Sequence, residues 1–267
     1  LGDGLVGHRY YIQVSEHRDV PVTLIRDQSQ EPPFRAMLCL HGHNSGAHLS
    51  WGETRMPEDP LKIAAGADYA LQAARRGFLA VCVEQACFGE RSERKMVKRS
   101  PHPCFDAAHN ALMLGHTLLG ERVVDVSAVI DWLLGDGAEF EIDPQKIYAM
   151  GNSSGGDTTV FTAALDPRVS GIMAGGCVGR FRTTTGRREA CADIIIPGIL
   201  QWMEYDDIIA LCAPRPVVAV SGDRDHIYPF SEVAETIECA RSVYAAMEAT
   251  AKLTALAGKG GHRFYPE

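Results

Sequence analysis

The chain has 267 residues, of which 46% are hydrophobic and 22% are charged, a length and balance typical of one globular domain with a single core. The formal net charge of −8 at pH 7 argues against a nucleic-acid-binding surface, and no basic run is long enough to change that. No uninterrupted apolar run approaches the roughly 20 residues that cross a bilayer, so the sequence predicts no membrane-spanning helix.

Eight cysteines are spread along the chain, and none of them forms a C-x-x-C pair. Cys39 and Cys82 lie within apolar segments that are predicted to be buried strands. A chain of this length does not need a disulfide framework, so we interpret the thiols as small core hydrophobes. We therefore expect a reduced, cytoplasmic protein.

The N-terminal part predicts an antiparallel hairpin, with strands over residues 8–15 and 20–26 around a polar turn. After a proline-containing link, residues 36–40 form a continuous apolar run of the kind that is buried on both faces of a sheet. From here strand and helix patterns alternate, which predicts a mostly parallel central sheet with helices on both faces. Strands are expected over 78–83, 145–150, 169–174, 216–220 and 251–256, and helices over 60–76, 117–134, 157–165 and 231–247.

The apolar run 36–40 ends in His41-Gly42-His43-Asn44-Ser45-Gly46. A strand that ends in H-G-x is typical of serine hydrolases, in which this loop carries a main-chain N–H for an oxyanion hole. The donor expected here is the N–H of His43. The alternative is a metal site made by His41, His43 and His48, which we disfavour because no acidic or cysteine partner accompanies them locally.

A second group of polar residues has the pattern H-x-C-x-D-x-x-H, with His102, Cys104, Asp106 and His109. This pattern could be mistaken for a zinc site, but metal ligands usually have better-defined spacing. We expect these side chains to form hydrogen bonds within a loop, and we predict no metal.

The segment Gly151-Asn152-Ser153-Ser154-Gly155 joins a predicted strand to a predicted helix and matches G-x-S-x-G, the nucleophile elbow. Glycines flank the serine because a side chain there would collide with neighbouring backbone in so sharp a turn. Ser153 is thus the candidate nucleophile. The N–H of Ser154 begins the next helix and is a second candidate oxyanion donor.

Residues 179–208 interrupt the alternation of strands and helices, and we interpret them as a short cap-like insertion in a single domain over residues 1–267. Trp202, Glu204 and Tyr205 lie close together here. An aromatic face with nearby polar groups suits a sugar ring, so we expect these three residues to contact substrate. The alternative for Trp202 is that it anchors the insertion to the sheet.

Serine needs a base and an orienting carboxylate, and α/β-hydrolases supply these in the chain order Ser, Asp or Glu, His. Asp223 and Asp225 follow the predicted strand 216–220, and His262 follows the last strand in a glycine-flanked loop. Asp223 comes directly after Gly222, where it can bond turn amides, so we prefer Asp225 as the acid. The candidate catalytic residues are Ser153, Asp225 and His262.

Five segments resemble the acetyl xylan esterase-like, dienelactone-hydrolase-related branch of the α/β-hydrolases: residues 41–46, 121–125, 151–156, 213–216 and 261–264. The resemblance implies a carboxylic-ester hydrolase that acts on short acyl groups, often on acetylated sugars, without metal or cofactor. Dienelactone hydrolases proper use a cysteine nucleophile, and Ser153 departs from that pattern.

Two other functions remain open. A peptidase of the prolyl-oligopeptidase type shares the triad but normally adds a large N-terminal propeller, for which this sequence shows no pattern. A non-catalytic binding protein on the same scaffold would not need the apparent triad. The partner we expect is a small-molecule ester, and the sequence leaves homo-oligomerisation open.

Overall fold

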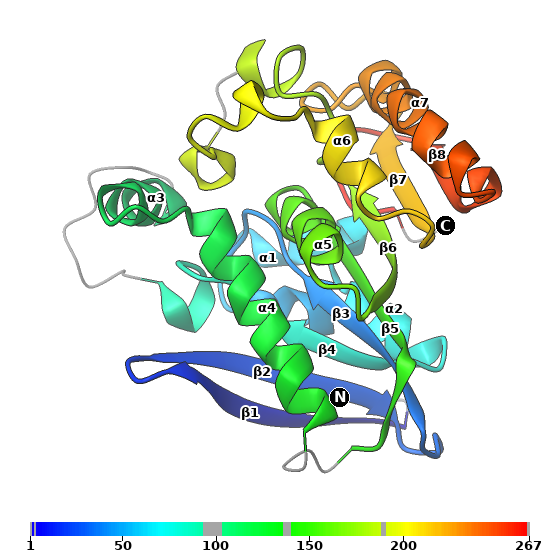
Figure 1. The fold of residues 1–267 in the computed structure, drawn as a ribbon. Helices are drawn as coiled ribbons and strands as arrows, with labels where there is room; N and C mark the ends of the chain where they lie inside the picture. Colours follow the sequence, from blue (N-terminus) through cyan, green and yellow to red (C-terminus); the bar gives the residue numbers. More distant parts are fainter. Residues whose placement is uncertain (1, 3, 93–102, 136–139, 188–190, 266–267) are drawn as a thin grey trace.

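Eight strands form one sheet in the order β1-β2-β4-β3-β5-β6-β7-β8 in the computed structural model, which describes residues 2, 4–92, 103–135, 140–187 and 191–265 (Figure 1). The strands are β1 (Leu5–Ser15), β2 (Arg18–Asp27), β3 (Phe34–Leu40), β4 (Leu79–Val83), β5 (Ile142–Asn152), β6 (Val169–Gly175), β7 (Val217–Gly222) and β8 (Leu253–Gly258). β1 and β2 are antiparallel to each other, and β2 is antiparallel to β4. The other pairs are parallel, so the predicted hairpin and mostly parallel sheet are confirmed.

Helices cover both faces of this sheet (Figure 1). The α-helices are α1 (Asp59–Lys62), α2 (Tyr69–Arg75), α3 (Pro103–Met113), α4 (Leu118–Leu134), α5 (Ser154–Leu165), α6 (Tyr205–Ala210) and α7 (Phe230–Ala246). The short helical turns are η1 (Ala47–Trp51), η2 (Ile63–Ala67), η3 (Gly89–Arg91), η4 (Thr185–Arg187), η5 (Ala192–Ile194), η6 (Ile199–Gln201) and η7 (Thr250–Lys252). In the described part of the chain, none of the helices has both the length and the apolar character needed to cross a bilayer.

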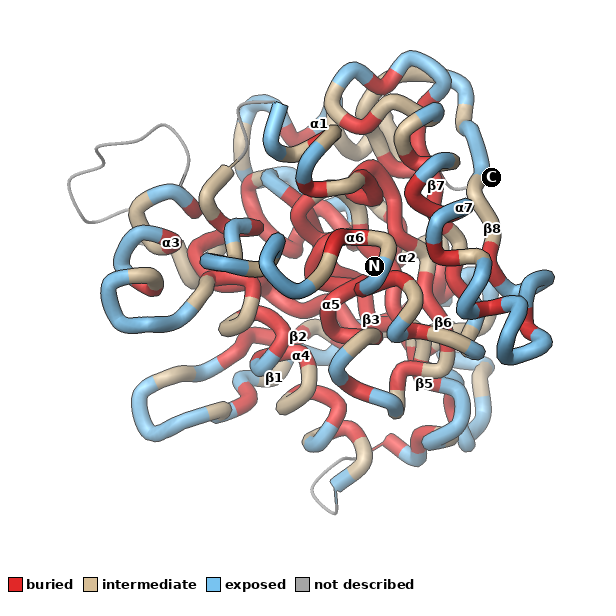
Figure 2. The backbone as a smooth tube through the Cα atoms, turned by 45° about the horizontal axis from the view of Figure 1, so that its top comes forward, coloured by how far each residue is buried: buried red, intermediate tan, exposed pale blue. Residues whose placement is uncertain are grey.

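The core follows from the two-residue period of the strands. Leu38 and Leu40 of β3 pack in the cluster that includes residues of α4 and α5, whereas Cys39 between them packs in the cluster that includes residues of α2. Successive side chains point to opposite faces of a strand, so a central strand that is apolar throughout is buried on both sides. Figure 2 shows the buried residues gathered along the central strands and α5.

The parallel strands bring their carboxyl ends, and the loops that follow them, to one edge of the sheet. β3 is followed by the His41–His43 loop, β5 by Ser153, β7 by Asp225 and β8 by His262. Ligand sites of open α/β sheets lie at this edge. Residues up to 221 positions apart in the chain, His41 and His262, are therefore candidates for one site.

Two sequence-based expectations about helices were wrong. Residues 60–76 do not form one helix, because Gly66 within η2 adopts a φ of 94° and interrupts the helical path between α1 and α2. The segment that contains Cys104, Asp106 and His109 is not a loop but helix α3, whereas His102 lies outside the described residues. The sequence does contain a helical pattern here, since Cys104, Ala108 and Ala111 have helical spacing, and all three are buried in the structure.

The turn after β5 is packed so closely that its glycines cannot be replaced without moving backbone. A Cβ at Gly155 would collide with the carbonyl oxygen of Leu40 and lie 2.6 Å from the carbonyl carbon of His41. A Cβ at Gly151 would collide with the carbonyl oxygen of Gly155. The sequence motif thus has a steric cause in the contact between β3 and the start of α5.

We predict that Gly155→Ala lowers the free energy of unfolding by more than about 2 kcal/mol, because the new methyl group meets backbone that has no room to move. Chemical denaturation measures this change. Gly261→Ala is the control, since its Cβ would meet only the Arg224 carbonyl oxygen, at 3.9 Å. Equal stability of the two variants would contradict the proposed packing constraint.

Candidate active site

Ser153 sits on a strained turn between β5 and α5. Its φ of 57° and ψ of −131° are unusual for a residue with a side chain, and its N–H donates to the Gly175 carbonyl at 2.7 Å. The carbonyl of Ser153 accepts hydrogen bonds from Gly156 and Asp157, which starts the helix. In a nucleophile elbow, this strained backbone conformation exposes the nucleophile above the edge of the sheet.

The loop after β3 lies directly against this turn. A Cβ at Gly42 would collide with the carbonyl oxygen of Asn152 and stand 3.0 Å from the Ser153 Cβ. His43 follows Gly42 and lines the same cavity as Ser153 and Ser154. The N–H of Ser154, in the first turn of α5, has no acceptor within the helix, so both expected oxyanion donors belong to segments that border Ser153.

His262 and Asp225 form a hydrogen-bonded pair, with 2.8 Å between His262 Nδ1 and Asp225 Oδ2. The other carboxylate oxygen of Asp225 accepts the N–H groups of Ile227 and Tyr228 at 2.8 and 2.9 Å. Burial disfavours the charged carboxylate, but the hydrogen bonds from His262 and Tyr228 outweigh it and hold the pKa of Asp225 below its ordinary value. An ionised Asp225 favours the tautomer of His262 with its proton on Nδ1, which leaves Nε2 free to accept a proton.

Asp223 has a different position. It is exposed, and its Oδ1 accepts the N–H of Gly260 at 2.8 Å. The contact ties the turn after β7 to the glycine-rich loop after β8. Asp223 therefore shapes the loop that carries His262, whereas Asp225 contacts the imidazole itself.

Ser153 and His262 both line a cavity of about 800 Å³ at the carboxyl edge of the sheet. His262 also lies close to the end of β6, because a Cβ at Gly176 would be 2.9 Å from its Cε1. The cavity has a mixed lining of polar and apolar side chains. Its polar residues include Asn44, Lys62, Thr184, Thr185 and Arg263, and its apolar and aromatic residues include Tyr69, Phe105, Ile194, Ile227 and Phe264.

A buried ion pair that the sequence reasoning did not find lies behind the elbow. Arg122 of α4 donates to Asp193 Oδ2 and to Ser154 Oγ, both at 2.7 Å, and Ser154 Oγ donates to the same carboxylate oxygen at 2.7 Å. Burial alone would raise the pKa of Asp193, but the charges of Arg122 and His43 outweigh burial and lower the pKa to about 2. The pair thus fixes η5 of the insertion against the first residue of α5.

Asp157, one turn into α5, is buried and also borders the cavity. Burial raises its pKa to about 8, although the hydrogen bond from the Tyr205 hydroxyl, 2.9 Å from Oδ1, opposes this shift. At neutral pH the Asp157 carboxyl group is therefore protonated in most molecules, and it acts as a neutral hydrogen-bonding group.

The three residues expected to contact substrate do not line the cavity. Trp202 is 84% exposed, so it does not anchor residues 179–208 in the core. Glu204 caps α6 and accepts the N–H groups of Phe181 and Arg182, and Tyr205 is buried against Asp157. Residues 179–208 do line the cavity, but through Thr184, Thr185, Cys191, Asp193 and Ile194. Of the three, Glu204 serves as a helix cap, Tyr205 packs in the core and Trp202 is exposed.

His41, His43 and His48, which were considered as one metal site, each contact different side chains. His41 lies 3.0 Å from Glu84, and His48 contacts Ser45 and Asp59. Within the described part of the chain, His43 is the one of the three that belongs to a group of at least three ligand-type side chains, and the others come from distant parts of the chain: Cys104, Cys191 and Asp193.

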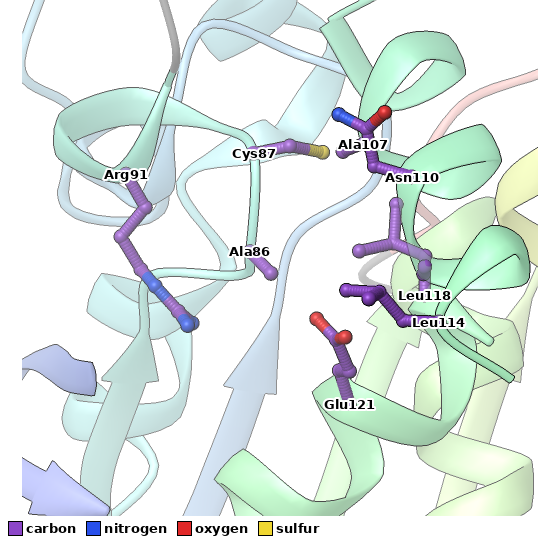
Figure 3. Close-up of a pocket in the computed structure, with 9 residues that line it drawn as sticks. Ala86, Cys87, Arg91, Ala107, Asn110, Leu114, Leu118 and Glu121 are labelled. Carbon is purple, nitrogen blue, oxygen red and sulfur yellow. The ribbon is translucent and has the colours of Figure 1, made fainter. Parts of the chain in front are cut away.

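A second cavity of about 270 Å³ lies between the segment after β4 and helices α3 and α4 (Figure 3). Ala86, Cys87 and Arg91 line one side of it, and Asn110 and Glu121 are among the residues on the other. It is lined by none of the candidate catalytic residues. The larger cavity is therefore the candidate active site.

A sheet of this order, with a serine on a strained strand-to-helix turn at its carboxyl edge, defines the α/β-hydrolase class. A sequence model described as "Abhydrolase family" matches residues 18–255, and the chain belongs to this family of hydrolases. It is also 22% identical, over 261 residues, to the "Putative hydrolase YtaP" of Bacillus subtilis (strain 168). That similarity covers 94% of this chain and 80% of YtaP.

Solved structures with the same fold include esterases. The "putative acetyl xylan esterase" of Bacteroides fragilis NCTC 9343 superposes with a TM-score of 0.78 and 18% identity, over 97% of this chain and 68% of that chain. The glucuronoyl esterase of Solibacter usitatus superposes with a TM-score of 0.70 and 13% identity, over 98% of this chain and 79% of that chain. At this identity the likeness establishes the fold.

Proposed function

We propose that the protein hydrolyses carboxylic esters with a short acyl group, through an acyl-enzyme formed on Ser153. The observation that carries this proposal is the hydrogen-bonded pair of His262 and Asp225 at the same cavity as a serine on a strained elbow. A nucleophile, a base and an orienting carboxylate are the three groups that acyl transfer requires.

In the proposed mechanism, His262 Nε2 takes the proton of Ser153 as the Oγ attacks the ester carbonyl carbon. The N–H groups of His43 and Ser154 stabilise the oxyanion of the tetrahedral intermediate. When the C–O bond to the alcohol breaks, His262 returns the proton to the leaving oxygen. Water then attacks the acyl-enzyme by the same steps and releases the carboxylic acid. Asp225 stabilises the imidazolium that forms in each half-reaction.

The alcohol part of the substrate is proposed to be a sugar or another polyhydroxylated group. The cavity lining supports this, because Asn44, Lys62, Thr184 and Thr185 offer hydrogen-bonding groups and Phe105 offers an aromatic surface. The similarity in fold to an acetyl xylan esterase supports acetyl as the acyl group. We also propose a reducing, cytoplasmic setting, since all eight cysteines are free thiols.

We predict that Ser153→Ala lowers kcat for an aryl acetate by more than about 10⁴-fold, because the acyl-enzyme can no longer form. A fluorophosphonate probe should label Ser153 in the wild-type protein, and mass spectrometry of the peptides identifies the labelled residue. Ser170→Ala, a serine of β6 outside the cavity, should react as the wild type does. Activity that survives in Ser153→Ala, or labelling at Ser154, would disprove the assignment.

Acyl selectivity tests the substrate class. We expect acetyl and propionyl esters to have a kcat/KM at least about 10-fold higher than octanoyl esters of the same alcohol. A series of p-nitrophenyl esters measures acyl length, and acetylated sugars and peptide p-nitroanilides test the leaving group. Faster turnover of octanoyl esters would reject the short-acyl proposal. Turnover of the anilides alone would indicate a peptidase, and no turnover at all a binding protein.

The two aspartates give a matched comparison. Asp225→Asn should lower kcat by about 10³-fold or more, because the amide favours the wrong tautomer of His262. Asp223→Asn should have a much smaller effect, since Asp223 accepts the Gly260 N–H and pairs with Arg224 rather than with His262. Because the folded-state pKa of Asp225 is lowered, its ionised form should stabilise the fold above about pH 4, and this stability should be lost as pH falls through the folded-state value. The reverse ranking of the two variants would make Asp223 the catalytic acid.

A further inference from the structure

Four side chains with metal-binding atoms meet beside the candidate active site: His43, Cys104, Cys191 and Asp193. They come from the loop after β3, the first turn of α3, the residue before η5, and η5 itself. One ligand atom from each lies within 4.8 Å of all the others. No sequence motif joins them, because the nearest two are separated by one residue and the farthest by more than half of the chain.

The separations of the ligand atoms approach those of a tetrahedral site. His43 Nε2 lies 3.2 Å from Cys104 Sγ and 3.4 Å from Asp193 Oδ2. With Zn–S bonds of about 2.3 Å and Zn–N bonds of about 2.0 Å, tetrahedral ligands stand roughly 3.3–3.8 Å apart. The two sulfur atoms are 2.6 Å apart and must separate by about 1 Å to accept an ion. Cys191 is only half-buried and lies in a loop, so it is the ligand that can move.

The buried carboxylate of Asp193 keeps one oxygen without a hydrogen-bond partner among the described residues. Asp193 has no exposed surface, and among the described residues its Oδ1 has no hydrogen-bond partner. Its other oxygen already accepts Arg122 and Ser154. The oxygen that lies 3.4 Å from His43 Nε2 is Oδ2, so Oδ2 is the ligand atom nearest the cluster, and Oδ1 is a further acceptor on the same buried carboxylate.

A divalent cation that displaces both thiol protons would leave the cluster electrically neutral. With both thiols ionised, Cys104, Cys191 and Asp193 carry three negative charges and the neighbouring Arg122 carries one positive charge. A divalent ion would bring this sum to zero. Two thiolates, an imidazole and a carboxylate form a ligand set suited to zinc rather than to calcium or magnesium, which prefer oxygen.

We propose that His43, Cys104, Cys191 and Asp193 bind a zinc-class divalent cation. On binding, each thiol loses its proton to solvent and forms a metal–sulfur bond. The ion would join α3 and η5 to the loop of His43, whose main-chain N–H the proposed mechanism uses. The cavity reaches the cluster, since His43, Cys191 and Asp193 line it. The metal site does not depend on the proposed esterase activity.

A disulfide between Cys104 and Cys191 is the competing outcome. It would explain why the two sulfur atoms meet, but it uses neither His43 nor the carboxylate of Asp193. The convergence of all four side chains favours the metal, and the experiment below distinguishes the two.

The test is metal binding by the full-length protein, after removal of bound metals with a chelator and full reduction. We expect one equivalent of Co²⁺ to give the thiolate-to-cobalt charge-transfer band and the intense visible bands of tetrahedral cobalt. Zn²⁺ should displace Co²⁺ with sub-micromolar affinity and raise the melting temperature. Cys104→Ser and Cys191→Ser should each lose about half of the charge-transfer band and weaken Zn²⁺ binding by at least about 10-fold.

Cys239→Ser is the matched control, because Cys239 is an exposed cysteine of α7 outside the cluster. It should bind both metals as the wild type does. Cys191→Ser keeps the test decisive if the fully buried Cys104 cannot be replaced without unfolding. Absence of the cobalt bands in reduced wild-type protein would overturn the proposal, as would equal binding by Cys191→Ser and Cys239→Ser. Protein that resists reduction and has a Cys104–Cys191 cross-link by mass spectrometry would also overturn it, in favour of the disulfide.

Discussion

The close approach of the β3 and β5 ends is the constraint on which the candidate site depends. Gly42 and Gly155 have no side chain because the backbone of the neighbouring turn occupies that space. This contact holds Ser153 in its unusual conformation and places the His43 loop beside it. Strain of this kind persists only where the surrounding structure over-determines it. Here the buried carboxyl-terminal halves of β3 and β5 provide the support.

The insertion after β6 is connected to this elbow by charge rather than by apolar packing alone. The Arg122–Asp193 pair is fully buried and includes the hydroxyl of Ser154, the residue whose N–H is a proposed oxyanion donor. Removing one partner of a buried pair leaves an uncompensated charge, which costs about 3–5 kcal/mol. Asp193 also belongs to the proposed metal cluster. The same carboxylate therefore links the insertion, the start of α5 and the loop of His43.

Most of the fold could be predicted because its signals are local. The glycine-flanked Ser153, the apolar strands and the glycine-rich loop of His262 each have a pattern that is readable within a short stretch, and the alternation of strands and helices predicts the mostly parallel sheet. The choice of Asp225 over Asp223 also began from a local argument about the turn. Helix α3 was not predicted because its polar residues were interpreted as a hydrogen-bonded loop, although its buried face has ordinary helical spacing.

The sequence by itself determined the α/β-hydrolase scaffold and the order of the candidate catalytic residues, since both depend on residue types at short, fixed spacings. Only the tertiary structure decided what surrounds them. It placed Trp202 in solvent and Tyr205 in the core, and it brought Cys104 and Cys191 together across 87 positions of the chain. Such contacts depend on how separate loops fold over one sheet edge, and no periodicity or motif in a single chain records that geometry.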